Sequence, residues 1–176
     1  MNQISIAKQA IATHETALYV NEFMSHVSSV NSQKKVHDIA MSKISIKGGM
    51  ILEFGVFSGK TINHIADTLK SSIVDGFDSF EGLPEFWIDG YGKGFFATDA
   101  LPNVKSNVRL HKGWFDDALP KFLRDTPADQ KIAYLHIDCD LYSSTATVFN
   151  LLGNRIVSGT IIVFPCVCND VYITVF

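Results

Sequence analysis

The sequence has few cysteines, no clustered positive charge, and no apolar stretch near the ~18 residues that a membrane span requires. Its three cysteines, Cys139, Cys166 and Cys168, form no CxxC pair, which disfavours both a disulfide framework and a zinc site of ordinary spacing. Lysine and arginine total 15 against 18 acidic residues, without a basic run, so neither nucleic acid nor a membrane is an expected partner. The N-terminus lacks the pattern of a signal peptide. We therefore expect a reduced, cytoplasmic protein that acts on a small molecule.

The pattern of apolar residues predicts an α/β fold. The 176 residues are 47% hydrophobic and 19% charged, as in a single globular unit. Short apolar segments predict strands at 50–54, 72–77, 107–112, 132–137 and 159–164, with helical spacing after Gly59, over 117–124 and over 144–156. Alternating strands and helices predict a Rossmann-like, doubly wound, mainly parallel sheet within residues 48–176. Residues 1–47 are expected to form a helical N-terminal segment that caps this domain.

A glycine-containing turn follows the first predicted strand. In ILEFGVFSGKT, Glu53, Gly55 and Gly59 have ExGxxxG spacing, which lets the backbone turn and approach a ligand closely at a helix start. Phe57 stands where a dinucleotide-binding motif has its middle glycine, so a nucleoside fits better than a pyrophosphate. The same spacing also suits an ordinary strand-to-helix turn.

Two further segments extend this hypothesis. Asp78 ends the second predicted strand 19 residues after Gly59, where an acid can accept both hydroxyls of a ribose. Trp114, after the third strand, suits an aromatic wall for a purine, although it equally suits the core. These positions together favour a nucleoside-containing ligand.

The stretch LHIDCDLYSST places two carboxylates at the end of an otherwise apolar strand. If the extended backbone continues to position 140, Asp138 and Asp140 share one face with His136 behind them. Parallel strands end at a common crevice where strand order reverses, so these acids are expected near Gly55. Two acids there can hold a divalent cation or act as a base.

Four segments together resemble a known family. ILEFGVFSGKT, GFDSFEGLPE, KGWFDDALP and HIDCDLYSST are similar to the class I S-adenosylmethionine-dependent methyltransferases of the macrocin O-methyltransferase (TylF-like) family, over about residues 50–164. The resemblance implies that S-adenosylmethionine binds through Glu53, Gly55, Ser58 and Gly59 around its methionine part and ribose, Asp78 and Ser79 at the ribose, and Gly113 and Trp114 near the adenine. It also implies that Asp138 borders the cofactor and binds Mg²⁺, and that Asp140 is the general base.

The resemblance weakens after the fifth predicted strand. Family members carry an acidic pair there, whereas this chain has Pro165, Cys166 and Val167; Asp170 could contribute only if the loop folds back. The family also continues with two more strands and a helix, so we expect a truncated sheet in which VYITVF adds one strand at most.

The resulting hypothesis is an O-methyltransferase acting on a hydroxyl of a small molecule, such as a sugar or a glycosylated natural product. Aromatic residues in segment 85–96 suit a lid over the acceptor, or equally a core cover or a contact in a homo-oligomer. One alternative is a protein that binds S-adenosylmethionine without efficient catalysis. Another, a nicotinamide-dependent dehydrogenase, is disfavoured by Phe57.

Overall fold

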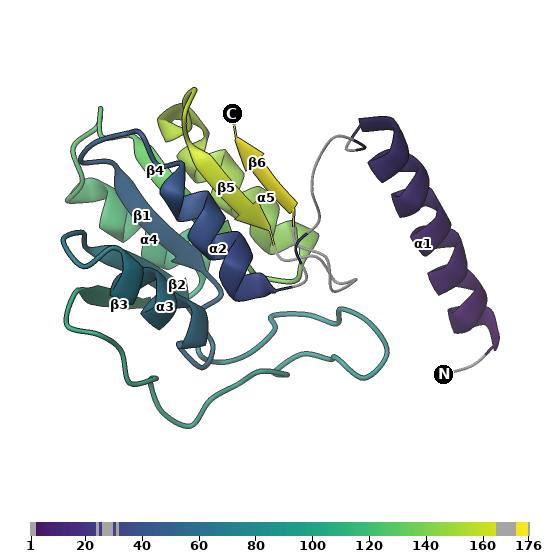
Figure 1. Ribbon diagram of the computed structural model, residues 1–176. Coiled ribbons are helices and arrows are strands. Elements are labelled where there is room, and N and C mark those ends of the chain that lie inside the picture. Colours follow the sequence, from purple (N-terminus) through teal and green to yellow (C-terminus); the bar gives the residue numbers. More distant parts are fainter. Residues whose placement is uncertain (1–2, 24, 26–29, 31, 165–171, 176) are drawn as a thin grey trace.

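A single six-stranded sheet forms the centre of the protein. The computed structural model describes residues 3–23, 25, 30, 32–164 and 172–175. The strands are β1 (Met50–Phe54), β2 (Val74–Asp78), β3 (Val108–Lys112), β4 (Ile132–Ile137), β5 (Ile161–Phe164) and β6 (Tyr172–Val175), in the spatial order β3-β2-β1-β4-β5-β6 (Figure 1). The first five are parallel, and β6 pairs antiparallel with β5. The order reverses between β1 and β4, which creates the crevice expected at their carboxyl ends.

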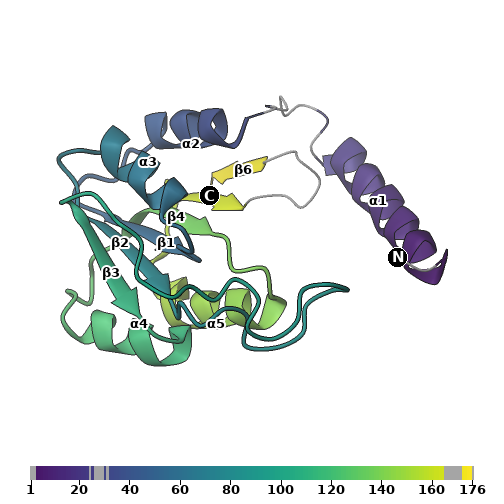
Figure 2. The ribbon, with the colours of Figure 1, turned by 90° about the horizontal axis from the view of Figure 1, so that it is seen from below.

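Helices cover both faces of the sheet. On one face lie α2 (Gln33–Ser42) and α3 (Lys60–Thr68), and on the other lie α4 (Phe115–Arg124) and α5 (Tyr142–Leu152), which runs into a short 3-10 turn (Gly153–Arg155), as Figure 2 shows. Alternating residues of β1 serve the two faces: Ile51 packs in the core beneath α2 and α3, whereas Leu52 and Phe54 pack beneath α4 and α5. Covering both faces explains why β1 and β4 are buried along their whole length.

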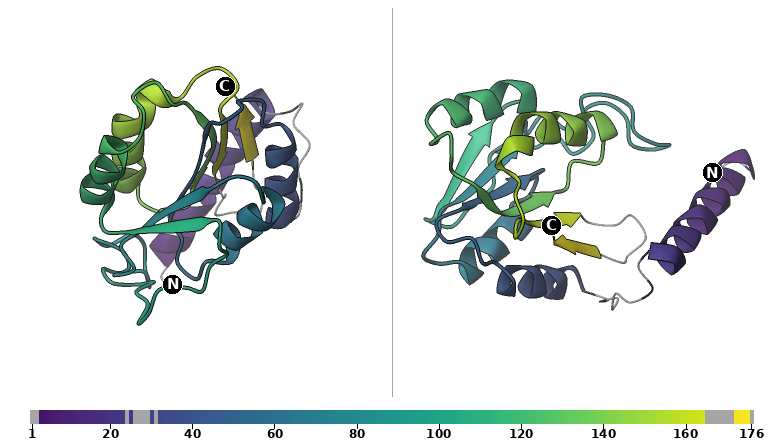
Figure 3. Two further views of the ribbon diagram at one scale, coloured as in Figure 1. Left: turned by 90° about the vertical axis from the view of Figure 1, so that its left-hand side faces the viewer. Right: turned by 90° about the horizontal axis from the view of Figure 1, so that it is seen from above.

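The N-terminal helix α1 (Gln3–Phe23) lies apart from the sheet, as Figure 1 and the right-hand view of Figure 3 show. Large apolar side chains that are more than half exposed occur along it: Ile4, Ile6, Ile11, Leu18, Tyr19 and Phe23. Neither α1 nor any other helix in the described ranges is long and apolar enough to span a membrane.

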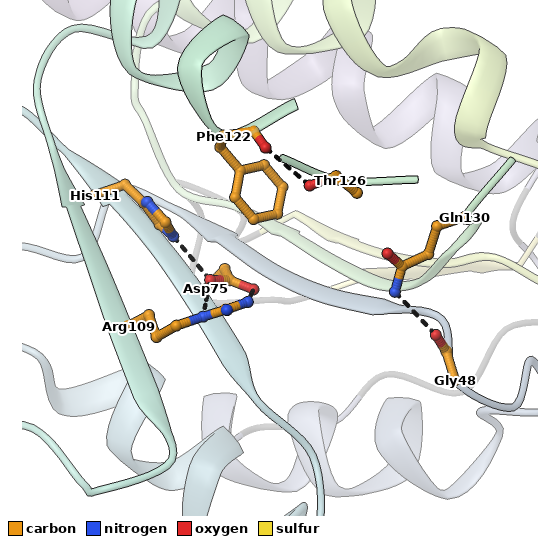
Figure 4. A network of polar contacts seen from close by, with 7 residues as sticks. All are labelled: Gly48, Asp75, Arg109, His111, Phe122, Thr126 and Gln130. Atoms are coloured by element: carbon orange, nitrogen blue, oxygen red, sulfur yellow. Dashed lines mark hydrogen bonds and ion pairs between the residues drawn. The ribbon is translucent and has the colours of Figure 1, made fainter. Parts of the chain in front are cut away.

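A polar cluster stabilises the sheet on the α4 side. Asp75 of β2 is 4% exposed and accepts two hydrogen bonds from Arg109 of β3, at 2.8 and 2.7 Å. His111 Nε2 lies 2.7 Å from the same carboxylate (Figure 4). With Lys112, Lys121 and Gln130, these residues line a groove beside the amino ends of β1, β2 and β4, hereafter the amino-end groove.

The sequence-based fold prediction is confirmed. All five predicted strands are present, although β2 begins at Val74 and β5 at Ile161. The helices predicted at 117–124 and 144–156 begin two residues earlier than expected, at Phe115 and Tyr142. The C-terminal segment contributes one strand, β6, which adds an antiparallel edge to the sheet next to β5.

Candidate functional site

A cavity of about 370 Å³ opens at the carboxyl ends of the strands. It is called the carboxyl-end cavity below. Segments that follow β1, β2, β3 and β4 contribute to it, together with α5. Its lining residues are Gly55, Phe57, Asp78, Ser79, Gly82, Leu83, Pro84, Phe96, Trp114, Phe115, Asp116, Asp138, Cys139, Asp140, Ser143, Ser144 and Thr147. Its volume lies in the ordinary range for small-molecule sites.

The turn after β1 brings the backbone against the end of β4. Gly55 has φ +90°, and a side chain there would overlap the carbonyl oxygen of Asp138. The Asp138 N–H donates to the carbonyl of Phe54 at 2.8 Å, so the two strands stay paired up to the edge of the cavity. Glycine is therefore required at position 55 both by conformation and by space.

Asp78, at the end of β2, fastens two loops to the cavity edge. One carboxylate oxygen accepts the backbone N–H of Phe57 at 2.8 Å, and the other accepts that of Phe80 at 2.7 Å. Both phenylalanines have positive φ, at +46° and +59°, a conformation that costs energy for a residue with a side chain. The acid predicted to bind ribose hydroxyls thus also stabilises the glycine turn, while each oxygen keeps a lone pair for a ligand.

The segment after β3 forms another wall. The Gly113 N–H donates to the Asp78 carbonyl at 3.0 Å, and Trp114, which is 37% exposed, lines the cavity. Asp116 lies in the first turn of α4 and also lines the cavity. We expected acidic residues to open this helix, but the sequence did not indicate that Asp116 faces the cavity.

The two aspartates after β4 both reach the cavity, but by a different path from the one expected. The alternation predicted through position 140 is wrong, because β4 ends at Ile137 and Asp140 has φ +58°. Leu141 N–H donates to the Cys139 carbonyl across this tight turn. The turn, instead of a continued strand, brings Asp140 to the cavity rim.

Both carboxyl groups bind protons more tightly than usual. Burial raises the pKa of Asp138, although the electrostatic interaction with His136 opposes this shift. Burial also raises the pKa of Asp140 to about 6, and the nearby Asp138 charge adds to the shift even though Asp140 reaches solvent at the rim. A carboxylate with a pKa near neutrality suits a general base.

Hydroxyl groups from α5 form the wall next to Asp140. Ser143, Ser144 and Thr147 line the cavity, and the Ser143 hydroxyl donates to Glu85 at 2.7 Å. This bond joins α5 to the irregular segment that precedes the aromatic residues of the predicted lid. Of those aromatics, Phe96 lines the cavity and packs edge-to-face on Phe57 at 5.4 Å.

Four predicted cofactor-binding residues do not line the cavity. Glu53 is fully buried, with its carboxylate 3.2 Å from His136 Nδ1, and burial raises its pKa. Ser58 is exposed, Gly59 is the N-cap residue of α3 and lies next to Pro102, and Gly113 precedes the cavity-lining Trp114. These four residues lie outside the cavity lining, and their contact with a ligand stays a prediction.

A buried polar cluster lies between Glu53 and α2. His37 Nδ1 is 2.6 Å from the Tyr134 hydroxyl, and the rings of His37 and His136 meet edge-on at 4.6 Å. Burial, with the neighbouring histidines, lowers the pKa of His37 to about 3. His37 is therefore neutral at physiological pH, and His136 is a packed strand residue outside the cavity.

A Mg²⁺ site is not evident in the described part of the chain. Asp138, the predicted metal ligand, lies within it, but no group of three or more His, Cys, Asp or Glu residues there could hold a metal ion. Asp170, Cys166 and Cys168 lie outside the described residues.

Known proteins resemble this chain in both sequence and fold. The family model described as "Methyltransferase domain" matches residues 52–165. Among solved structures, CalS11, a calicheamicin methyltransferase, has 22% identity and a TM-score of 0.63 over 74% of this chain and 62% of its own. An apo structure of CalS11, described as a TDP-rhamnose 3'-O-methyltransferase, has 22% identity and a TM-score of 0.58 over 77% and 63%. The O-methyltransferase NovP has 25% identity and a TM-score of 0.52 over 74% and 64%.

These matches differ in what they establish. The chain spans less than two thirds of the length of each of these structures, and no curated protein matches it. The structural likeness identifies the fold, while the sequence match extends over more than half of the 176 residues. On that match, the chain belongs to the methyltransferase-domain family.

Proposed function

We propose that the protein is an S-adenosylmethionine-dependent O-methyltransferase that acts on a hydroxyl group of a small molecule. The observation that carries this proposal is that one cavity is lined by the glycine turn, by an acid at the end of β2, and by an acid with a raised pKa after β4. The first two suit a nucleoside donor, and the third suits an acceptor hydroxyl.

The donor half of the cavity fits S-adenosylmethionine. Asp78 retains lone pairs for ribose hydroxyls, Ser79 lies beside it, and Trp114 offers an aromatic surface for adenine. Gly55 and Asp138 would border the methionine part. S-adenosylmethionine supplies a methyl group already activated by its sulfonium, so the protein has to align the acceptor and remove its proton.

Asp140 is the proposed base. Its position on the rim allows an acceptor hydroxyl to approach from solvent, and its pKa of about 6 leaves it ionised but basic at neutral pH. The turn centred on it holds the carboxylate in the cavity lining beside Ser143 and Ser144.

Mg²⁺ remains a prediction from the family resemblance. Because the described residues contain no group of three or more potential ligands placed to hold a metal ion, the ligand set there is incomplete for an all-protein site. We therefore assign no step to the ion.

A sugar hydroxyl, in a free sugar or a glycosylated natural product, is the proposed acceptor. CalS11 is described as a TDP-rhamnose 3'-O-methyltransferase, and the hydroxyl-lined wall of α5 offers hydrogen-bonding partners of the kind a polyol needs.

Isothermal titration with S-adenosylmethionine and, separately, NAD tests this proposal. We expect the first to bind and the second not to. Because Asp78 also holds two loops, Asp78→Ala alone cannot isolate its contact with ribose. The sharper comparison titrates the intact protein with S-adenosylmethionine analogues that lack the 2'- or 3'-hydroxyl, which should bind at least about tenfold more weakly if Asp78 accepts both.

Two outcomes would reject parts of the proposal. No binding of S-adenosylmethionine by the intact protein would reject the donor, and equal affinity for the deoxy analogues would reject the role of Asp78. Binding without methyl transfer to any hydroxyl acceptor would favour the alternative, a binding protein without efficient catalysis.

A further inference from the structure

The carboxyl-end cavity is strongly biased in charge. Four aspartates line it, Asp78, Asp116, Asp138 and Asp140, and none of its described lining residues is lysine, arginine or histidine. We propose that the acceptor is an amine-bearing polyol of the amino-sugar type, and that the cavity selects it over neutral and phosphorylated sugars by charge. This inference rests on the proposed function and specifies its acceptor.

None of the four acids forms an ion pair among the described residues. The ion pairs found there join Asp38 to His64, Asp67 to Lys105, Asp75 to Arg109 and His111, Asp117 to Lys121, and Glu53 to His136. Every one of these lies outside the cavity lining. Asp78 is hydrogen-bonded, but to backbone N–H groups, which leave its charge in place.

The bias does not come from a shortage of basic residues. Arg109, Lys112 and Lys121 line the amino-end groove, with Lys112 as the last residue of β3. None of these basic side chains lines the cavity, so a positively charged ligand would compensate its acids.

The proposed donor compensates only part of this charge. Its ammonium and carboxylate cancel, so the sulfonium leaves one net positive charge in a cavity that four aspartates line. A protonated amine on the acceptor would be attracted to the remainder, whereas a phosphate would meet like charge without any basic side chain to bind it.

The acceptor side of the cavity suits the rest of such a molecule. Ser143, Ser144 and Thr147 supply hydroxyls beside Asp140, and Glu85, bonded to Ser143, places a further carboxylate next to this wall. Phe96 provides an apolar surface for the carbon face of a sugar ring. Hydroxyl, amine and ring would thus each find a partner of matching chemistry.

The test uses glucosamine, glucose and glucose 6-phosphate as probes, titrated at neutral pH into the protein saturated with S-adenosylhomocysteine and followed by saturation-transfer NMR. We expect glucosamine to bind at least about tenfold more tightly than glucose, and glucose 6-phosphate more weakly than either. Raising the salt concentration should reduce both differences.

A pair of neighbouring variants provides the matched control. Asp116→Asn removes a cavity charge and should lower the glucosamine preference severalfold, whereas Asp117→Asn, which removes an exposed charge paired with Lys121, should leave it unchanged. Equal binding of glucosamine and glucose, no glucosamine binding, or tighter binding of glucose 6-phosphate would overturn the inference. Repeating the titrations without S-adenosylhomocysteine shows whether the preference for glucosamine depends on the donor. If S-adenosylhomocysteine does not bind but glucosamine still binds more tightly than glucose, only the proposed function is rejected.

Discussion

The two ends of the sheet use aspartate in opposite ways. At the amino-end groove, Asp75 is buried and bonded to Arg109 and His111 (Figure 4). At the carboxyl-end cavity, Asp138 and Asp140 lie close enough for the charge of one to raise the pKa of the other, with no cation from the cavity lining beside them.

This difference indicates what each acid contributes. A buried carboxylate that is bonded to an arginine and a histidine has its desolvation offset and holds β2 to β3. The folded protein instead raises the pKa of Asp140 from 3.8 to about 6, so its contribution to stability falls as pH rises between these values. We therefore expect Asp75 to matter for folding and Asp140 for chemistry.

The largest expected effect is on catalysis, from Asp140→Asn. If Asp140 is the base, methyl transfer should fall by about 10²- to 10⁴-fold, while affinity for S-adenosylmethionine and thermal stability stay near those of the parent protein. In the parent protein, kcat/KM should rise with pH through about 6 as the Asp140 carboxyl loses its proton. The variant should not show this rise in its pH profile. A variant that retains the rise would show that another group is the base.

A smaller effect, on stability alone, is expected from Asp75→Ala. Removing the carboxylate leaves Arg109 and His111 without their shared partner and should lower the free energy of unfolding by about 2 to 3 kcal/mol, the low end for a broken buried pair because the Arg109 side chain is 58% exposed. Urea titration measures this loss, and a double-mutant cycle with Arg109→Ala isolates the pair. A loss as small as that of an exposed ion pair would remove the contrast between the two ends.

The smallest effect is expected from Lys121→Gln. Lys121 pairs with Asp117 one helical turn away at 2.6 Å, but both side chains are more than half exposed. Such pairs contribute about 0.3 to 0.5 kcal/mol, so urea titration should detect little change, and added salt should remove what there is. A loss comparable to that of Asp75→Ala would mean that proximity, and not burial, decides the strength of these pairs.

Sequence patterns predicted the sheet well because each strand has a strong apolar signal and four of them end at Gly55, Asp78, Gly113 or Asp138. The same patterns located much of the cavity, since parallel strands end at one edge of a sheet. They failed where position depends on tertiary geometry: the tight turn at Asp140 has no distinctive local motif. Asp116 looked like an ordinary residue of a helix start, and Glu53 is buried next to His136 of β4, which is far from it in the sequence.

The two hydrogen bonds of Asp78 matter for engineering the proposed donor site. Substitutions at position 78 that are meant to admit modified donors would remove the hydrogen bonds to Phe57 and Phe80 together. A change in donor selectivity could then not be distinguished from a change in the two loops that these bonds hold. Trp114 is a better starting point, because its side chain borders the same cavity without fastening either loop. Substituting it would enlarge the donor pocket while the scaffold that shapes it stays intact.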